Sequence, residues 1–226
     1  MTAHDVLLAI STSASPEVAL AENERAIAIA APGQALESLL PTIVRALDEF
    51  GAALDDVRRI AVCTGPGSFT GLRIGVAFAK TLAQSSLRRI VGVSAFDVAQ
   101  AGGPRETFPN AAIVMGKRDF YYARIVPSPE AEPQFANGNA AEISAALERC
   151  GVRPVEFARR LFAGAPGERA LRVASIGRQR FASGTAGDWR DVVIDYGQRP
   201  NAVVNWEKRQ NRRGGAPANA AKPSRQ

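Results

Sequence analysis

The sequence predicts an α/β protein of two lobes, with a mixed β-sheet in the first lobe. Two observations support this prediction. Short apolar runs, the first at residues 6–10, are typical of buried strands. Between the later runs lie segments with helical periodicity, and strands that alternate with helices imply a parallel part of a sheet. The length of 226 residues is enough for one large domain or for two small lobes.

The first three strands are expected to be antiparallel. Residues 6–10 (VLLAI) read as a fully buried strand that ends in a turn at 11–13. Residues 17–21 and 26–30 read as two further strands with a short turn between them. A meander of this kind next to parallel strands makes the sheet mixed.

The first helix is predicted after this meander. Its apolar side chains recur at spacings of four and three, which places them on one helical face. Pro41 is compatible with the first turn of this helix, and Gly51 is a plausible C-cap. The residues of the apolar face are Leu36, Leu40, Ile43, Leu47 and Phe50.

Strands and helices then alternate. A strand at 60–64 precedes a helix at about 71–84, and a strand at 90–93 precedes a helix at 95–100 that Ser94 is expected to cap. The full order of three strands, helix, strand, helix, strand and helix is that of the ribonuclease-H-like lobe found in actin, sugar kinases and Hsp70. The predicted fold class is therefore α/β, with two ribonuclease-H-like lobes whose mixed sheets are flanked by helices.

A Gly-Gly-Pro break at 102–104 separates the predicted lobes. The first lobe is expected to span residues 1–103, the second, diverged α/β lobe residues 104–204, and a flexible basic tail residues 205–226. In the second lobe the patterns predict strands at 111–115, 120–126, 172–176 and 192–196 and helices at 142–150 and 155–162.

Positive charge is concentrated in the tail. The formal net charge is +6, but residues 1–204 carry 22 basic and 21 acidic side chains, whereas residues 205–226 carry six and one. Basic tails bind phosphates by releasing counterions, and an aromatic ring beside them can stack on a base. The alternative is a solvated tail without a ligand. The residues predicted to contact nucleic acid are Trp206, Lys208, Arg209, Arg212 and Arg213.

The composition excludes several chemistries. Two distant cysteines and a single histidine provide neither a disulfide framework nor a zinc site. A Ser-His-Asp triad would have to use His4, which precedes the first apolar run. No apolar run approaches the length of a signal sequence or a membrane span, so a cytoplasmic location is expected. We therefore expect no catalytic residue, no metal and no cofactor.

The glycine-rich turn at 65–75 (GPGSFTGLRIG) is the most informative segment, because it joins a buried strand to a helix where many folds bind phosphate. It lacks the lysine of a Walker A loop and misses the dinucleotide fingerprint by one residue. Ser68 has neither the spacing nor the base of a nucleophile elbow. Three interpretations stay open: a tight turn capped by Ser68 or Thr70, a phosphate-binding loop, and an interface.

The helix after this turn favours the interface. Its apolar residues surround most of its circumference and leave a narrow polar stripe of Arg73, Lys80 and Gln84, so more than one side has to be covered. Gly71 and Gly75, four residues apart, would allow another backbone to come close. The residues expected to bind a partner are Gly65, Pro66, Gly67, Ser68, Phe69, Thr70, Gly71, Leu72, Arg73, Gly75, Val76, Phe78 and Ala79.

Residues 61–80 (AVCTGPGSFTGLRIGVAFAK) closely resemble the signature of the bacterial TsaB family, also called YeaZ. Three further segments agree with the family in order and spacing: LLAISTS at 7–13, ESLLPTI at 37–43 and VGVSAFDVA at 91–99. The resemblance covers residues 6–126 well and the remainder weakly.

This resemblance implies a function and a set of partners. TsaB is similar to TsaD, the catalytic subunit that transfers a threonylcarbamoyl group to N6 of adenosine 37 in tRNA, but it is regarded as non-catalytic. It forms a heterodimer with TsaD, which TsaE joins, and it also forms a homodimer; its first-lobe helices make both interfaces. We therefore expect a non-catalytic TsaB-like subunit that meets tRNA indirectly. The alternatives are a free-standing M22-like peptidase or ATPase of the same superfamily, or a basic-tailed RNA-binding accessory protein.

Three positions depart from the family pattern. Ser11 stands where the family usually has an aspartate, the residue that anchors a magnesium–nucleotide complex in this fold. Ala35 replaces the histidine of a His-Ser-Glu motif, and Met115 replaces the aspartate of an Asp-Ala-Arg-Arg motif. These departures argue against nucleotide chemistry and leave the glycine-rich turn unchanged.

Overall fold

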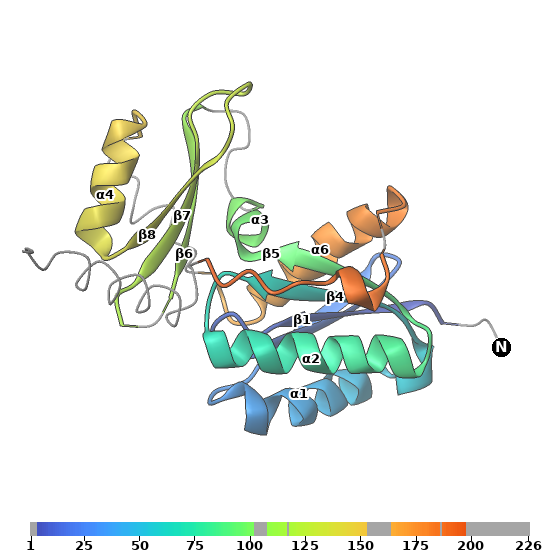
Figure 1. The fold of residues 1–226 in the computed structure, drawn as a ribbon. Coiled ribbons are helices and arrows are strands. Elements are labelled where there is room, and N and C mark those ends of the chain that lie inside the picture. Colours follow the sequence, from blue (N-terminus) through green and yellow to red (C-terminus); the bar gives the residue numbers. More distant parts are fainter. Residues whose placement is uncertain (1–3, 102–107, 117, 153–163, 186, 198–226) are drawn as a thin grey trace, which may run out of the picture.

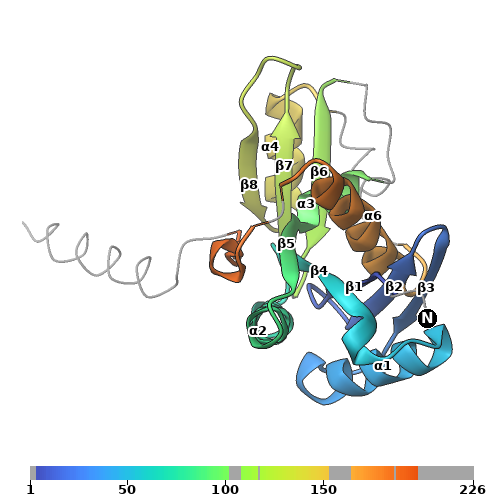
Figure 2. The same cartoon turned by 90° about the vertical axis from the view of Figure 1, so that its right-hand side faces the viewer.

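The structure, a computed structural model, describes residues 4–101, 108–116, 118–152, 164–185 and 187–197. In these residues the chain forms a five-stranded sheet and a three-stranded sheet, and helices pack on both (Figures 1 and 2). None of the described helices has the length and apolar character needed to cross a membrane.

The larger sheet has the strand order β3-β2-β1-β4-β5. Strands β1 (Val6–Ser11), β2 (Glu17–Glu22) and β3 (Arg25–Ala30) form an antiparallel meander. Strand β4 (Val57–Gly65) runs parallel to β1, and β5 (Arg89–Ser94) runs parallel to β4. The predicted mixed sheet is confirmed.

Helices cover both faces of this sheet because successive side chains of β1 point to opposite faces. Leu8 packs in the core beneath α1 (Ala35–Phe50) and α2 (Phe69–Ser85), and Leu7 packs in a second core beneath α6 (Glu168–Ala182). Every residue of β1 is buried, which explains the uninterrupted apolar run in the sequence.

The predicted strand at 172–176 is wrong, because these residues lie inside α6. Over five residues the small and β-branched side chains of RVASI look like a strand, and only the longer helical period distinguishes the two. Gly177 of α6 lies against Ala61 of β4, so the helix packs closely on the sheet. The buried residues of α6 follow helical spacing: Ala170, Val173, Ala174, Ile176, Gly177 and Phe181.

The chain after α6 also differs from the prediction. Residues 192–196 do not form a strand, although the Asp195 amide donates a hydrogen bond of 2.9 Å to the Thr64 carbonyl oxygen. The helix predicted at 155–162 lies outside the described residues.

The smaller sheet is antiparallel, with β7 (Tyr121–Val126) between β6 (Asn110–Met115) and β8 (Gln134–Gly138). Helix α4 (Ala140–Arg149) packs on one face and begins with a capping box between Asn139 and Glu142. The two strands predicted here are present, and β8 is an addition to the prediction.

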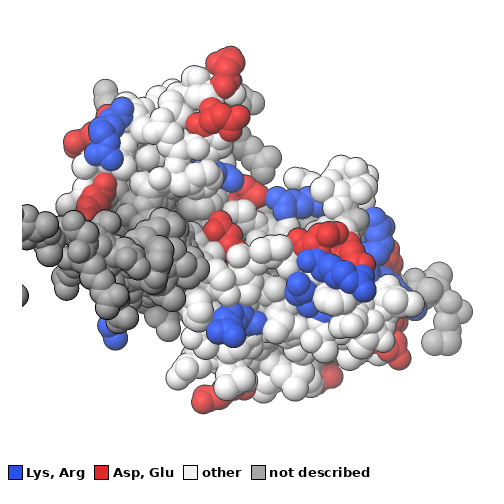
Figure 3. All heavy atoms as spheres, viewed as in Figure 1, with Lys and Arg blue, Asp and Glu red and all other residues white. Residues whose placement is uncertain are grey.

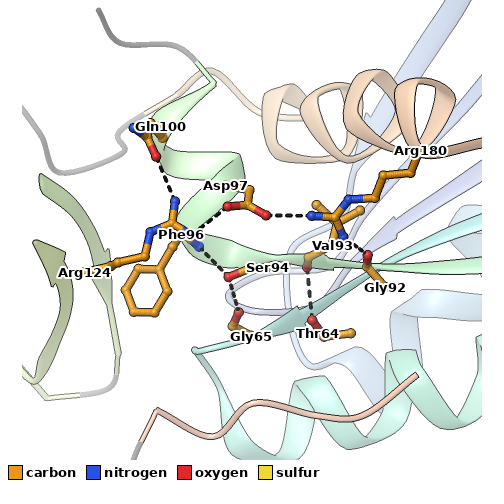
Figure 4. A network of polar contacts seen from close by, with 10 residues as sticks. All are labelled: Thr64, Gly65, Gly92, Val93, Ser94, Phe96, Asp97, Gln100, Arg124 and Arg180. Atoms are coloured by element: carbon orange, nitrogen blue, oxygen red, sulfur yellow. Dashed lines mark hydrogen bonds and ion pairs between the residues drawn. The ribbon is translucent and has the colours of Figure 1, made fainter. Parts of the chain in front are cut away.

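The short helix α3 (Ala95–Gln100) connects the two sheets (Figure 4). The Asp97 carboxylate accepts hydrogen bonds of 2.7 Å from Arg124 of β7 and from Arg180 of α6. Arg124 also donates to Gln100 at 2.7 Å. Residues 104–204 thus supply the three strands of the smaller sheet and the helix α6, which packs on the larger sheet.

Candidate partner-binding surface

The turn between β4 and α2 is tightly built. Gly65 has a φ of 105°, which favours glycine, and the Ser68 amide donates a hydrogen bond of 2.7 Å to the Ser13 carbonyl oxygen. The Ser68 hydroxyl caps α2 by accepting a hydrogen bond from the Gly71 amide at 3.3 Å. The turn is therefore held by its own cap and by the loop after β1, as the first of the three interpretations predicts.

Most of α2 faces its own chain. A Cβ atom built on Gly71 would overlap the Thr12 carbonyl oxygen, and one built on Gly75 would overlap Thr12 Oγ1. The close approach that the two glycines allow is thus an approach of the loop after β1. Several other residues expected to bind a partner are buried within the chain: Gly65, Pro66, Leu72, Val76 and Ala79.

The outer ridge of α2 consists of Phe69, Thr70 and Arg73, which are exposed. Phe69 is 54% exposed, and its ring stacks on Tyr196 with centroids 4.9 Å apart. The Arg73 guanidinium lies 5.5 Å from the centre of the Phe69 ring. Gly67, Ser68 and Phe78 are partly buried, so the exposed part of the predicted set is this ridge.

Helix α1 adds an exposed apolar stripe, and two of its residues, Leu36 and Leu40, belong to the apolar face that the sequence pattern predicted. Leu36, Leu40 and Val44 are 77%, 57% and 51% exposed, and their spacing of four places them in one row. The side chains of α1 that pack in the core lie on the adjacent face of the helix. They are Ala35, Leu39, Thr42, Ile43, Ala46, Leu47 and Phe50. The signal that could have revealed this is the excess of apolar residues, which is more than one helical face can bury.

Together these rows form one surface, which we call the α1–α2 face: Leu36, Leu40 and Val44 of α1 with Phe69 and Thr70 of α2. The two helices contact each other and lie on the same side of the larger sheet (Figure 1). The surface over them is mostly uncharged (Figure 3). Contiguous apolar surface of this kind marks a site of interaction with another macromolecule.

A buried polar cluster lies behind the glycine-rich turn. The hydroxyls of Ser11 and Ser13 are 3.3 Å apart and hydrogen bonded, and burial raises the pKa of the neighbouring Cys63 thiol. Thr12 Oγ1 is buried without a hydrogen-bond partner among the described residues. The side chains in this cluster are neutral, and no three His, Cys, Asp or Glu residues of the described chain gather into a group that could hold a metal ion.

The other positions singled out in the sequence lie apart from this surface or outside the described residues. Ala35 is buried at the start of α1, and Met115 is exposed at the end of β6. The predicted nucleic-acid contacts of the tail, from Trp206 to Arg213, lie outside the described residues and stay a prediction.

Comparison with known proteins points to one group. A family model described as "TsaD: tRNA N6-adenosine threonylcarbamoyltransferase" matches residues 30–127, a range that contains both α1 and α2. The chain is 42% identical over 64 residues to the "tRNA threonylcarbamoyladenosine biosynthesis protein TsaB" of Bacillus subtilis, covering 28% of each protein. It is 38% identical over 90 residues to a "tRNA N6-adenosine threonylcarbamoyltransferase" of Trichlorobacter lovleyi, covering 39% of this chain and 26% of the relative. The matches thus span about a quarter of the length of these curated relatives.

Similarity in structure extends over much more of the chain. A solved Pseudomonas aeruginosa protein, described as an uncharacterized protein with similarity to peptidase YeaZ, is 26% identical and superposes with a TM-score of 0.63. The match covers 86% of this chain and 100% of that protein. This likeness confirms the predicted fold class.

Proposed function

We propose, from the premise that this chain belongs to the TsaB/YeaZ family, that it is a non-catalytic subunit of the assembly that forms N6-threonylcarbamoyladenosine at position 37 of tRNA. In this proposal the chain binds a TsaD-type catalytic subunit through its α1–α2 face. The observation that carries the proposal is the exposed apolar row of Leu36, Leu40 and Val44 beside the Phe69 ridge. A row of this kind loses contact with water when a partner covers it, which favours association.

A non-catalytic role is supported by the cluster behind the glycine-rich turn. The Ser11 hydroxyl is hydrogen bonded to Ser13, at the position where the resemblance leads one to expect an aspartate. A neutral hydroxyl does not attract a magnesium ion as a carboxylate does. In the proposed assembly the transfer takes place in the TsaD-type subunit, and the present chain holds that subunit in its active form.

The remaining partners follow from the same proposal. A TsaE-type ATPase joins the complex, the chain also associates with a second copy of itself through the α1–α2 face, and tRNA is reached through the complex in the cytoplasm. The basic tail is a secondary RNA contact in this scheme. Deletion of residues 208–226 should then weaken the retention of tRNA by the assembled complex at low salt, and an unchanged, salt-dependent affinity would remove the tail from the mechanism.

The direct test is association with the TsaD-type protein of the same organism, measured by light scattering after size exclusion and by calorimetry. Leu40→Glu should weaken the complex by about 10-fold or more, because it places a charge in the apolar row. Leu87→Glu is the matched control. Leu87 is 95% exposed and lies just after the C-terminal end of α2, whereas Phe69 lies at its N-terminal end. If Leu40→Glu binds as tightly as the unchanged chain, the α1–α2 face is not the interface.

The enzymatic part of the proposal needs its own measurement. The chain alone should not modify tRNA when it is supplied with threonylcarbamoyl adenylate, and the TsaD-type subunit should do so faster when the chain is added. Formation of the modified adenosine by the chain alone would overturn the non-catalytic role.

A further inference from the structure

The segment after α6 lies along α2 on the side away from α1, as both cartoons show (Figures 1 and 2). We call residues 187–197 the C-terminal strap. Its Val192 side chain is buried in the core under α2, and the Lys80 ammonium of α2 donates a hydrogen bond of 3.0 Å to the Val192 carbonyl oxygen. Near its end the strap is fixed to β4 by the hydrogen bond between Asp195 and Thr64 and to α2 by the stacking of Tyr196 on Phe69.

A groove of about 430 Å³ runs between α2 and the strap. Its apolar lining comes from both sides, with Val76 and Ala77 on α2 and Val193 and Ile194 on the strap. Val193 is 72% exposed, although it belongs to a segment that is otherwise anchored to the core. Water is therefore in contact with an apolar side chain that the fold itself does not bury.

Two cations line the same groove. Arg73 and Lys80 lie on α2 seven residues apart, which is about two helical turns or 10 Å. Among the described residues, none that lines the groove is acidic, and neither cation forms an ion pair. The described part of the groove thus combines an apolar floor with two cations that have no ion-pair partner.

We propose that this groove, which we call the α2–strap groove, binds a segment of the TsaD-type partner that carries apolar side chains flanked by Asp or Glu. The inference rests on the proposed function and extends it, because the partner would cover α2 on both sides: the α1–α2 face on one side and the α2–strap groove on the other. The strap and α2 together then determine which partner segment fits the α2–strap groove.

Charge selects this occupant over the chain's own tail. Residues 205–226 carry six basic and one acidic side chain, so Arg73 and Lys80 repel them. An apolar segment flanked by acidic residues is stabilised in the groove by two interactions. Its carboxylates pair with Arg73 and Lys80, and its apolar side chains cover Val193. Opposite charges also raise the rate of association at low salt, and this advantage is screened as salt is added.

Filling the groove is the first test, with the TsaD-type protein of the same organism as the probe. Ala77→Trp should weaken its binding about 10-fold, because an indole would occupy the space between α2 and the strap. Gln84→Trp is the matched control, since it adds the same ring to an exposed position of α2 outside the groove, and it should bind like the unchanged chain. Thermal unfolding of both variants shows whether the fold is retained.

Reversing the charge is the second test. Arg73→Glu should weaken binding about 5-fold or more at roughly 50 mM salt, and the difference should shrink at roughly 500 mM salt as screening increases. Arg58→Glu makes the same change at an exposed arginine that does not line the groove, and it should leave the affinity unchanged.

The outcomes separate this inference from the function on which it rests. If Ala77→Trp and Arg73→Glu bind the TsaD-type protein normally while Leu40→Glu does not, the groove proposal fails and the proposed function stands. If the unchanged chain does not bind the TsaD-type protein at all, the proposed function fails. If Ala77→Trp reduces self-association but not binding to the TsaD-type protein, a second copy is the occupant and the present proposal is overturned.

Discussion

Gly75 of α2 packs directly against the side chain of Thr12, in the turn that follows β1. A Cβ atom at Gly75 would overlap Thr12 Oγ1 and approach Thr12 Cβ to 3.2 Å. The hydroxyl itself has no hydrogen-bond partner among the described residues. Gly71 and Gly75 in the first turns of α2 therefore let this helix approach the loop after β1. This close packing helps to hold the glycine-rich turn in place.

This contact predicts coupling between the two positions. Gly75→Ala should lower the free energy of unfolding by about 1–3 kcal/mol, because the added methyl group overpacks a closed site. Thr12→Ala removes the overlapping hydroxyl, so the double variant should lose less than the sum of the two single variants. Urea unfolding of the four proteins measures the coupling. If the losses in unfolding free energy of the two single variants add up in the double variant, the Thr12 side chain is not the reason that position 75 requires glycine.

The junction between the sheets should depend on Asp97. Asp97→Asn removes the negative charge between two part-buried arginines, Arg124 and Arg180, and should cost about 1–3 kcal/mol. The control is Glu49→Gln, which breaks the exposed pair with Arg45 at the surface of α1 and should cost about 0.5 kcal/mol or less. Equal losses in the two variants would contradict a special role for Asp97.

The single histidine offers a site-specific pH test. A hydrogen bond to Glu22 raises the pKa of His4 above its ordinary 6.5, and the same contact lowers the pKa of Glu22 below its ordinary 4.5. The contribution of His4 to stability is therefore complete below its unfolded pKa and disappears as the pH rises through its folded pKa. The contribution of Glu22 is present above its unfolded pKa and is lost as the pH falls through its folded pKa.

Proton NMR can follow this titration because the chain has one histidine. In Glu22→Gln the pKa of His4 should fall back toward 6.5, because the carboxylate that favours the protonated imidazole is replaced by a neutral amide. A pKa that does not move in this variant would mean that the pair does not form in solution.

The two cysteines should differ in reactivity. Cys63 is 1% exposed, and burial raises the pKa of its thiol, so it should resist alkylation in the folded protein. Cys150 is partly exposed and should react. In Cys150→Ser the remaining thiol should be labelled only as the chain unfolds in denaturant, and rapid labelling of that variant under native conditions would show that the β4 core is open.

The first lobe could be predicted from the sequence because its elements carry simple patterns. The run at 6–10 is apolar at every position, and the face that includes Ile43, Leu47 and Phe50 repeats with a helical period. The Ser68 cap was one of two candidates, and the structure selects it over Thr70. Local signals were sufficient at these places because each element buries its own residues against the element beside it.

Other elements could not be identified in this way. The segment RVASI lies in α6, and its character as a helix shows only when residues from Ala170 to Phe181 are considered together. For Leu36 and Leu40 the period was right but the face was wrong, because two apolar rows lie side by side on α1 and only packing decides which one reaches the core. No local pattern indicated that the strap would lie along α2.

The sequence by itself determined the mixed α/β sheet, the glycine-rich turn with its capped helix, and the resemblance to TsaB, since these depend on neighbouring residues or on fixed spacing. Only the tertiary structure decided what α2 touches. It brought Thr12 against Gly75, left Leu36 and Leu40 in water, and laid Val193 along α2. These contacts join residues far apart in the chain, and where a helix carries two apolar rows, only tertiary packing determines which row is left for a partner.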